Sequence, residues 1–227
     1  DTIAEEFIRD HGGVPAFKNY KPSFSRTPYP FTLCMSVNDK VVHGFPSKER
    51  VLQEGDILAA DCGVMMDGYY GDSAYTFAVG QVSPEVRQLL DTTYEALHIG
   101  LEHATHGTRL GTLSDAIQAH VEAKGFGIVR DMVGHGIGRN IHEPPEVPNY
   151  GRKGTGLRLK AGMVLCIEPM INLGTGDIYT EEDGWTIRSK DHSPSVHYER
   201  MVAVGKEEAD ILTPYDIIEQ ELETVSV

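Results

Sequence analysis

The sequence predicts an α+β fold of two similar halves, each with a helix and antiparallel strands. Residues 52–61 (LQEGDILAAD) and residues 159–168 (LKAGMVLCIE) repeat one pattern, in which an apolar run ends on an acid. When the glycines of the two segments are aligned, Asp61 falls on Glu168. A repeated helical pattern that closes at a glycine supports the same duplication. The two halves are therefore expected to deliver one carboxylate each to a shared site.

The chain opens with a predicted amphipathic helix over residues 1–11. Its apolar side chains fall on one face, which is formed by Ile3, Ala4, Phe7 and Ile8. Gly12 and Gly13 follow at once, and glycine commonly ends a helix. We expect the helix to close there.

Three strands complete the first half. Residues 31–37 and 57–65 are rich in β-favouring side chains, and Asn38-Asp39 separates them as a turn. Asp67-Gly68 is typical of a tight hairpin turn, which predicts that residues 72–79 pair with the strand before it.

The second half begins with a long helix. Ser83 has the form of an N-cap, and Pro84 fits the first helical position. A further helix is expected from Leu113 to Lys124, where Gly125 closes it. The strands predicted after it lie near residues 126–133, 163–168, 185–188 and 199–204.

Residues 1–227 are expected to form a single catalytic domain. Its halves would span about 1–82 and 83–205, followed by an acidic C-terminal tail over 206–227. The helix from Pro84 has no counterpart ahead of the first residue, and the chain does not begin with Met. We therefore expect a leading N-terminal helix to be missing from a truncated or processed chain.

The composition is ordinary for a soluble globular protein, with 227 residues of which 40% are hydrophobic and 24% charged. There is no apolar run of the ~18 residues that a membrane span needs, and no secretory leader. Three cysteines are too few for a disulfide framework. These features predict a cytoplasmic protein with no membrane association.

The net charge of −14 comes from 20 basic and 34 acidic residues. Nucleic acids and anionic membranes are bound by clustered Lys and Arg, so no nucleic-acid surface is expected. Part of the negative charge could face inward as metal ligands. The segment 216–223 (DIIEQELE) is more simply explained as a solvated acidic end.

Two glycine-rich segments are poor matches to nucleotide-binding motifs. In residues 134–139 (GHGIGR), Arg139 stands where a dinucleotide fingerprint needs its third glycine. In residues 151–156 (GRKGTG), the lysine precedes the glycine instead of following it, unlike a phosphate-binding P-loop. A GxSxG nucleophile motif is absent. The histidines and acids remain as the residues that could carry chemistry.

One of these acids alone would most simply be a helix cap or a solvated strand end, and one histidine a hydrogen-bonded structural residue. Together they form an oxygen-rich set of four carboxylates and one imidazole: Asp61, Asp72, His135, Glu168 and Glu199. Such ligands suit Mn, Fe(II), Co or Zn, and bridging carboxylates hold metal pairs ~3.5–4 Å apart. The set predicts metal-assisted hydrolysis at a dinuclear site.

Short motifs in a fixed order carry a family resemblance. They are Val42-His43-Gly44-Phe45-Pro46, Ala60-Asp61, Gly71-Asp72, Gly134-His135-Gly136-Ile137-Gly138, Ile141-His142-Glu143, Ile167-Glu168-Pro169-Met170, Asp183-Gly184-Trp185-Thr186 and Tyr198-Glu199. Together they resemble the type I methionine aminopeptidases, which are metallopeptidases of family M24 with the pita-bread fold. The resemblance runs from about Tyr29 to Gly205. It implies two pseudo-symmetric halves around a dinuclear metal site.

The resemblance also implies a role for each site residue. Two divalent metal ions would be bound by Asp61, Asp72, His135, Glu168 and Glu199. Glu168 would also handle the water proton, His142 would steady the developing oxyanion, and His43 would contact the scissile amide. Tyr29, Cys34 and Trp185 match positions that line the methionine side-chain pocket, whereas Ile141 stands where the family often has Phe.

By the same resemblance, the substrates would be the N-termini of nascent polypeptides with a small second residue. A monomer and a transient ribosome contact are expected. Two alternatives stay open at this point: an exopeptidase resembling Xaa-Pro aminopeptidases, and a metal-free pita-bread module that only binds its partners. The complete ligand set argues against the second, because repelling acids would gather there without a cation.

Overall fold

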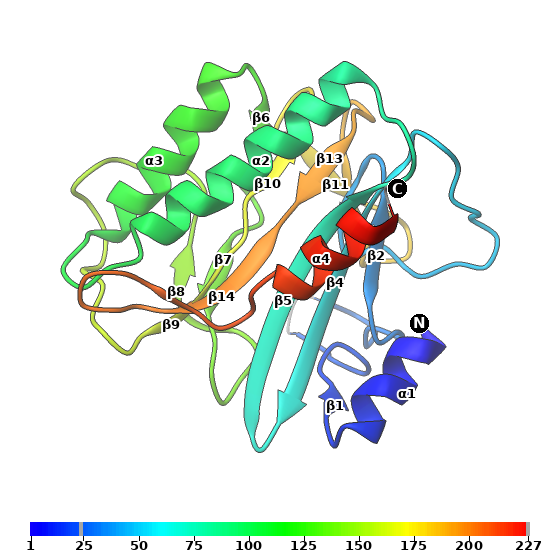
Figure 1. The fold of residues 1–227 in the computed structure, drawn as a ribbon, viewed down its shortest axis with the longest axis horizontal. Helices are drawn as coiled ribbons and strands as arrows, with labels where there is room; N and C mark the ends of the chain where they lie inside the picture. Colours follow the sequence, from blue (N-terminus) through cyan, green and yellow to red (C-terminus); the bar gives the residue numbers. More distant parts are fainter. Residues whose placement is uncertain (23–24, 226–227) are drawn as a thin grey trace.

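A nine-stranded sheet forms the centre of the molecule in the computed structural model, which describes residues 1–22 and 25–225 (Figure 1). The strands follow the order β1-β4-β5-β14-β9-β7-β8, with β2 paired to β4 and β15 paired to β14. Their bounds are β1 Val14–Pro15, β2 Cys34–Val37, β4 Ile57–Met66, β5 Tyr69–Ala78, β7 Gly134–Gly136, β8 Glu143–Val147, β9 Val164–Ile167, β14 Glu199–Ala203 and β15 Asp210–Ile211. Strands from both halves of the sequence therefore share one sheet.

Two three-stranded sheets accompany the large one, in the orders β13-β10-β6 and β11-β12-β3. Their bounds are β3 Lys40–Val42, β6 Gly127–Ile128, β10 Met170–Asn172, β11 Ile178–Thr180, β12 Ile187–Ser189 and β13 Ser195–His197. The β12–β3 pairing joins the two halves of the chain a second time.

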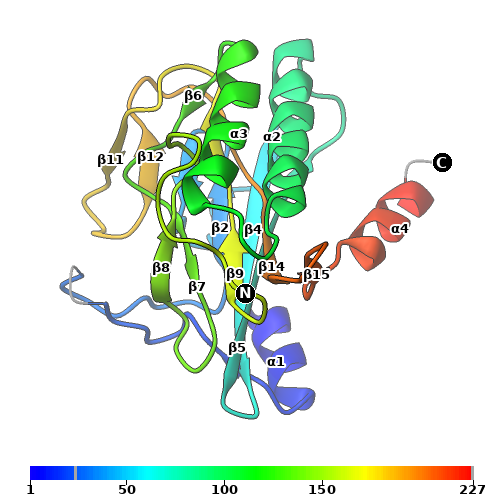
Figure 2. The same cartoon turned by 90° about the vertical axis from the view of Figure 1, so that its left-hand side faces the viewer.

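The four helices of the described residues are α1 (Thr2–Asp10), α2 (Pro84–Glu102), α3 (Leu110–Ala123) and α4 (Asp216–Val225). The long helices α2 and α3 lie side by side along one side of the large sheet, whereas β11 and β12 lie on the opposite side (Figure 2). No helix of the described residues is both long enough and apolar enough to cross a membrane.

The main hydrophobic core lies between this helix pair and the sheet strands. It is formed by apolar residues of α2, α3, β9 and β14, with Leu89, Leu97, Leu113, Ile117, Leu165 and Val202 all fully buried. A second, smaller cluster gathers Phe17, Tyr29, Cys34, Ile141 and Trp185 from both halves. That second cluster lies beside the functional site described below.

Most of the predicted elements are present. The hairpin turn at Asp67-Gly68 is confirmed, since both residues have positive φ angles of 53° and 80° between β4 and β5. Ser83 caps α2 by accepting a hydrogen bond from the Val86 amide, as its position predicted. The helix predicted from Leu113 begins at Leu110, one turn earlier.

The strand predicted near residues 126–133 is shorter than expected, because only Gly127–Ile128 forms β6. The amphipathic helix predicted at the start of the chain is confirmed as α1. Its apolar face is only partly covered, since Ile8 is buried whereas Ile3 and Phe7 are 83% and 64% exposed. The ring of Phe7 packs against that of His11, with centres 4.2 Å apart.

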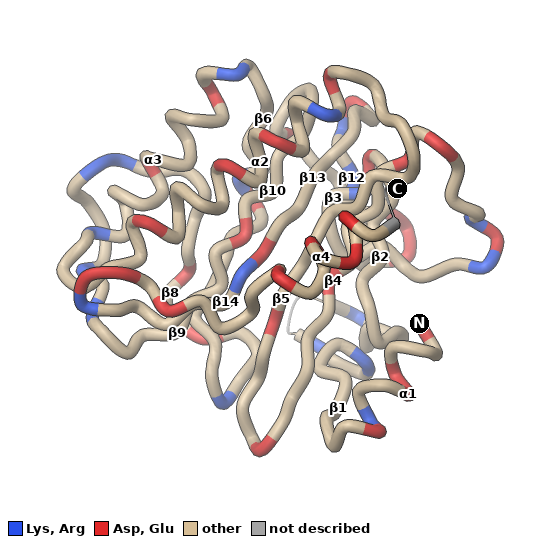
Figure 3. Tube along the Cα trace, viewed as in Figure 1, with Lys and Arg blue, Asp and Glu red and all other residues tan. Residues whose placement is uncertain are grey.

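The C-terminal segment is more than a solvated acidic end. Its residues pair with β14 through β15 and then form α4, whose Glu219 accepts a hydrogen bond from the Tyr94 hydroxyl of α2. Figure 3 shows Lys and Arg scattered around the trace instead of gathered along one helix or strand.

Candidate metal centre

Neighbouring strands of the large sheet carry the predicted ligands to one place. In sheet order, β4 carries Asp61, β5 carries Asp72, β14 begins with Glu199, β9 is followed directly by Glu168, and β7 carries His135. The first two come from the first half of the chain and the other three from the second half. The structure therefore brings together all five residues that the sequence predicted as metal ligands.

The register of the strands explains why the carboxylates face one another. Ala74 is paired with Asp61 on one side and with Glu199 on the other. Asp72 lies two residues before Ala74, so its side chain points to the same face of the sheet. Diagonal and next-neighbour positions on one face lie within reach of each other's side chains.

Glycines let His135 enter between two strands. A Cβ atom on Gly134 would lie 2.4 Å from the carbonyl oxygen of Cys166, and one on Gly136 would lie 2.4 Å from that of Pro144. Any larger residue would push β7 away from its neighbours. The two glycines around His135 are therefore needed for close packing of the strands, which holds the imidazole at the carboxylates.

The carboxylates are buried, with exposed fractions of 9% for Asp61, 4% for Asp72, 8% for Glu168 and 2% for Glu199. Burial raises the pKa of Asp72 to about 7. Burial and the charges of neighbouring carboxylates raise the pKa values of the other three well above their usual range. Four acids crowded in this way repel each other when ionised.

A cation fits this arrangement. Asp61 Oδ1, Asp72 Oδ1 and Glu199 Oε1 are buried and have no hydrogen-bond partner among the described residues. Within the described part of the chain, no Lys or Arg side chain forms an ion pair with any of these four carboxylates. Buried, unpaired oxygens that share a small volume are suitable ligands for divalent metal ions, which prefer hard oxygen donors.

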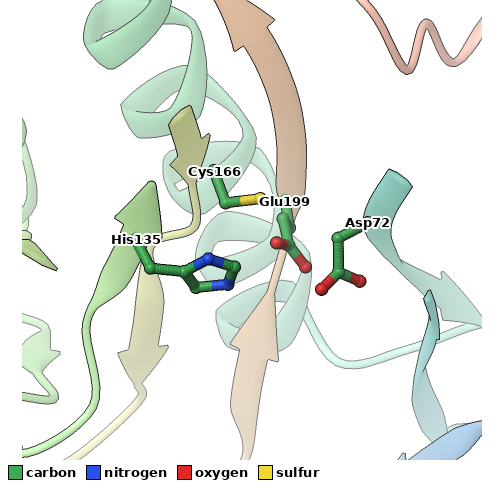
Figure 4. Close-up of side chains that lie close together, drawn as sticks. All are labelled: Asp72, His135, Cys166 and Glu199. Carbon is green, nitrogen blue, oxygen red and sulfur yellow. The ribbon is translucent and has the colours of Figure 1, made fainter. Parts of the chain in front are cut away.

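His135 is held in the form that can bind a metal. Its Nδ1 lies 2.9 Å from the carbonyl oxygen of Gly136, so that nitrogen carries the proton and donates it. The other nitrogen, Nε2, lies 3.5 Å from Glu168 Oε1. Burial lowers the pKa of His135, which favours the neutral imidazole. Figure 4 shows the ring directed at Glu199, with Asp72 on the far side.

Cys166 also reaches this cluster, which the sequence analysis did not anticipate. Its sulfur points toward Glu199 from β9 (Figure 4). Burial and the charges of Glu199, Asp72 and Glu168 raise the pKa of the thiol well above its usual value. In the metal-free protein the protonated thiol can donate a hydrogen bond to Glu199.

His197 is a second residue that the sequence analysis missed. Its Nε2 lies 3.5 Å from Glu168 Oε2 and has no hydrogen-bond partner in the described part of the chain. Burial lowers its pKa to about 3, so the ring is neutral. Thr76 fixes its backbone by donating to the His197 carbonyl and accepting from its amide. The sequence offered one signal for His197, its position two residues before the predicted ligand Glu199.

A cavity of about 980 Å³ opens onto the carboxylates. One wall is the aromatic cluster, in which Trp185 and Tyr29 make an edge-to-face contact with ring centres 5.1 Å apart. Cys34 lies in the same wall, and Ile141 belongs to the same cluster without lining the cavity. All four residues are at least 95% buried. The predicted pocket residues Tyr29, Cys34 and Trp185 therefore lie together beside the metal ligands.

His43 and His142 line the same cavity from different sides. His43 has a positive φ of 60°, which is uncommon for a residue other than glycine. Burial lowers its pKa to about 4. His142 is exposed to solvent. Partial burial lowers its pKa to about 4, with further contributions from His135 and His43. Both imidazoles are neutral at pH 7.

Tyr20 is a further residue that the sequence did not reveal. Its hydroxyl lies 2.8 Å from His142 Nδ1, and the ring of His142 lies 4.4 Å from that of His135. If the hydroxyl donates to Nδ1, then the proton of the neutral imidazole is on Nε2. This contact can orient His142 as a hydrogen-bond donor.

The chain matches the model of metallopeptidase family M24 over residues 1–206. It is 47% identical over 213 residues to the methionine aminopeptidase of Clostridium acetobutylicum, covering 94% of this chain and 83% of the relative. It is 44% identical to methionine aminopeptidase 1 of Bacillus subtilis, again over 94% of this chain and 83% of the relative.

Solved structures agree with the sequence matches. The crystal structure of methionine aminopeptidase from Thermotoga maritima superposes with a TM-score of 0.89 at 42% identity, covering 93% of this chain and 83% of that one. The X-Pro aminopeptidase of the same organism gives a TM-score of 0.62 at 23% identity, covering 84% of this chain and 48% of that one, a likeness in fold alone. The predicted α+β pita-bread fold is confirmed.

Proposed function

The chain belongs to metallopeptidase family M24, and we infer that it is a methionine aminopeptidase, a metal-dependent hydrolase that releases the N-terminal methionine of polypeptides. Its substrates are peptides and nascent proteins with a small second residue. The cavity beside the carboxylates is the active site. One observation carries this function: buried carboxylates from both halves converge without a cationic side chain.

The metal centre consists of Asp61, Asp72, His135, Glu168 and Glu199, which bind two divalent ions. When bound, these ions supply Lewis-acid activation of water and of the substrate carbonyl. Mn, Fe(II), Co and Zn all accept this donor set, so cellular availability selects among them.

Glu168 is the general base and acid of the reaction. Its two oxygens lie beside His135 and His197, and both of those imidazoles are neutral. In the metal-free protein, burial and the charges of Asp72 and Asp61 raise the pKa of the Glu168 carboxyl, which increases its affinity for a proton. Glu168 can therefore take a proton from the attacking water and return it to the leaving amine.

His142 and His43 act on the substrate amide. A neutral His142 whose Nδ1 is occupied by Tyr20 presents its Nε2 proton to the cavity, where it can donate to the developing oxyanion. His43 lines the cavity next to Trp185, with ring centres 6.1 Å apart, and from there it would contact the scissile amide of a bound substrate.

The aromatic cluster forms the pocket for the methionine side chain. Tyr29, Cys34 and Trp185 offer a desolvated wall, and Tyr29 keeps its hydroxyl satisfied by donating toward the Gly44 and Leu33 carbonyls. An unbranched thioether packs well against aromatic edges and fills irregular space. A charged side chain would lose its hydration here without gaining a partner.

The proposal includes the setting in which the enzyme works. A monomer formed by the single domain of residues 1–227 meets its substrates in the cytoplasm, through transient contact with the ribosome. Sedimentation of the purified protein with and without ribosomes tests both the monomer and the contact.

A peptide panel tests the activity directly. Metal-loaded protein should release methionine from Met-Ala-Ser and Met-Gly-Met, and leave a matched peptide with a bulky second residue intact. Release of residues next to proline, with both methionine peptides untouched, would replace this function with that of an Xaa-Pro exopeptidase. No turnover of any peptide and no bound metal would favour a pita-bread binding module.

A further inference from the structure

The C-terminal segment runs antiparallel along β14 as far as a metal ligand. Asp210 and Ile211 pair with Ala203 and Val202. The Leu212 amide then donates to the Met201 carbonyl at 2.8 Å, and the Met201 amide donates to Thr213 Oγ1 at 2.8 Å. Tyr215 makes the last contact of this series, at Glu199.

The Tyr215 hydroxyl bridges the two strands that meet between the halves. It accepts a hydrogen bond from the Glu199 amide at 3.0 Å. It lies 2.6 Å from the Ala74 carbonyl oxygen and 2.7 Å from the Glu199 carbonyl oxygen, between which its single proton is shared. One side-chain group thus binds the backbone of β5 and of β14 at once.

Among the described residues, β14 and β5 are joined by a short register. Glu199 pairs with Ala74, and Arg200 pairs with Ser73. Asp72 lies two residues from Ala74, and Glu199 is itself one of the paired residues. The spacing of these two carboxylates therefore depends on a short junction, and Tyr215 adds hydrogen bonds at its last pair.

The ring of Tyr215 is held firmly in place. It is 1% exposed, and the Arg200 guanidinium lies over it, 3.9 Å from the ring centre. Tyr75 packs against its edge with ring centres 4.9 Å apart. A buried aromatic ring that is fixed on two sides can hold its hydroxyl at one point.

We propose that Tyr215 is a positioning residue of the metal centre, which holds Glu199 and Asp72 at the separation that two metal ions require. It acts through the backbone of the strands and contacts neither substrate nor metal. The inference rests on the proposed metal centre. It also gives the C-terminal segment, which lies outside the strands that carry the ligands, a part in metal binding.

The test removes one hydroxyl at a time. Tyr215→Phe keeps the ring and loses the bridge. Thr213→Val is the matched control, because it removes a hydroxyl from the same segment. The Thr213 hydroxyl accepts a hydrogen bond from the Met201 amide and does not contact Glu199 or Asp72. Mn²⁺ affinity by calorimetry and the melting temperature of the metal-free protein are measured for each.

We expect Tyr215→Phe to weaken the binding of Mn²⁺ by about tenfold, as the loss of groups that orient metal ligands does. Thr213→Val should lower the melting temperature with Mn²⁺ affinity within about twofold of the original. Equal affinity in Tyr215→Phe and the unchanged protein would overturn the inference. If the unchanged protein bound no Mn²⁺, the proposed function itself would fail, which is a distinguishable result.

Hydrogen exchange of the unchanged protein provides a second test that needs no variant. If docking of residues 210–215 favours metal binding, metal binding must favour docking by the same factor. Peptides covering 210–215 should therefore gain more protection with Mn²⁺ than peptides covering α3. Equal gains in both regions would contradict a positioning role, even if Tyr215→Phe failed to fold.

Discussion

We propose two roles for Glu168, as a metal ligand and as the group that moves the proton. Glu168→Gln keeps the size of the side chain and removes its proton affinity. We predict a loss in kcat of about 10²–10⁴-fold, the range for a general acid or base, with a small change in melting temperature. Steady-state kinetics on a Met-Ala peptide and thermal denaturation measure the two effects.

His142→Ala is the companion variant, since His142 lines the cavity without belonging to the ligand set. It should lower kcat and leave the metal content nearly intact, as metal analysis after dialysis would show. Comparable metal loss in both variants would remove the division of roles between the two residues.

Asp72 allows a prediction about pH. Its pKa is about 7 in the folded protein, against an ordinary 3.8. The folded state therefore binds this proton more tightly, so the stability contributed by the group is full below pH 3.8 and is lost as pH rises to 7. Asp72→Asn removes the titration and should stabilise the metal-free protein most above pH 7.

Melting curves of the metal-free Asp72→Asn and unchanged proteins, compared from pH 4 to pH 8, test this sign. Each kcal/mol recovered should raise the melting temperature by about 2–4 °C in a domain of this size. With Mn²⁺ present the order should reverse, because the variant lacks a ligand. A difference that shrinks as pH rises would show that the carboxyl is not held in a proton-retaining site.

Sequence reasoning selected the five residues that cluster here because each is an acid or histidine at the end of, or within, a β-rich motif. It did not identify His197, Tyr20 or Cys166, whose roles arise from contacts between distant segments. The Tyr20 hydroxyl meets His142 across 122 positions of the chain. No local pattern carries such information.

At the scale of elements, β7 depends on glycine. Gly136→Ala places a Cβ 2.4 Å from the Pro144 carbonyl and should shift the strand that carries His135. We expect a destabilisation of about 1–3 kcal/mol, the usual cost of overpacking, together with weaker metal binding. Urea denaturation and Mn²⁺ calorimetry measure both.

Gly71→Ala is the matched control, because Gly71 lies next to the predicted ligand Asp72 but a Cβ placed on it would have no neighbouring atom closer than 4.0 Å. It should fold and bind metal normally. If Gly71→Ala were as damaging as Gly136→Ala, then the close approach of β7 and β8 would not explain the requirement for glycine.

The long elements were predictable from the sequence, and the short ones were not. β4, β5 and α2 each contain enough periodic residues, with an Asp-Gly turn or a Ser-Pro cap at the boundary. Strands such as β10 and β13 have three residues, too few to show a period. These strands form through tertiary pairing. The helix α4 was also not anticipated, because residues 216–223 were interpreted as a solvated acidic end.

At the scale of the whole molecule, the fold places four buried carboxylates close together, and bound cations would offset their mutual repulsion. The sheet order joins strands of both halves, so the site exists only when the complete sheet has formed. Metal binding and folding are therefore linked. A ligand that binds only the folded state, at a free concentration 100 times its Kd, adds about 2.7 kcal/mol of stability.

Titration of metal-free protein with Mn²⁺, followed by calorimetry and by melting temperature, tests this central claim most directly. The account predicts two ions per chain, a rising melting temperature, and loss of both effects in Glu199→Ala. A protein that binds no Mn²⁺ and melts at the same temperature with and without it would contradict the account.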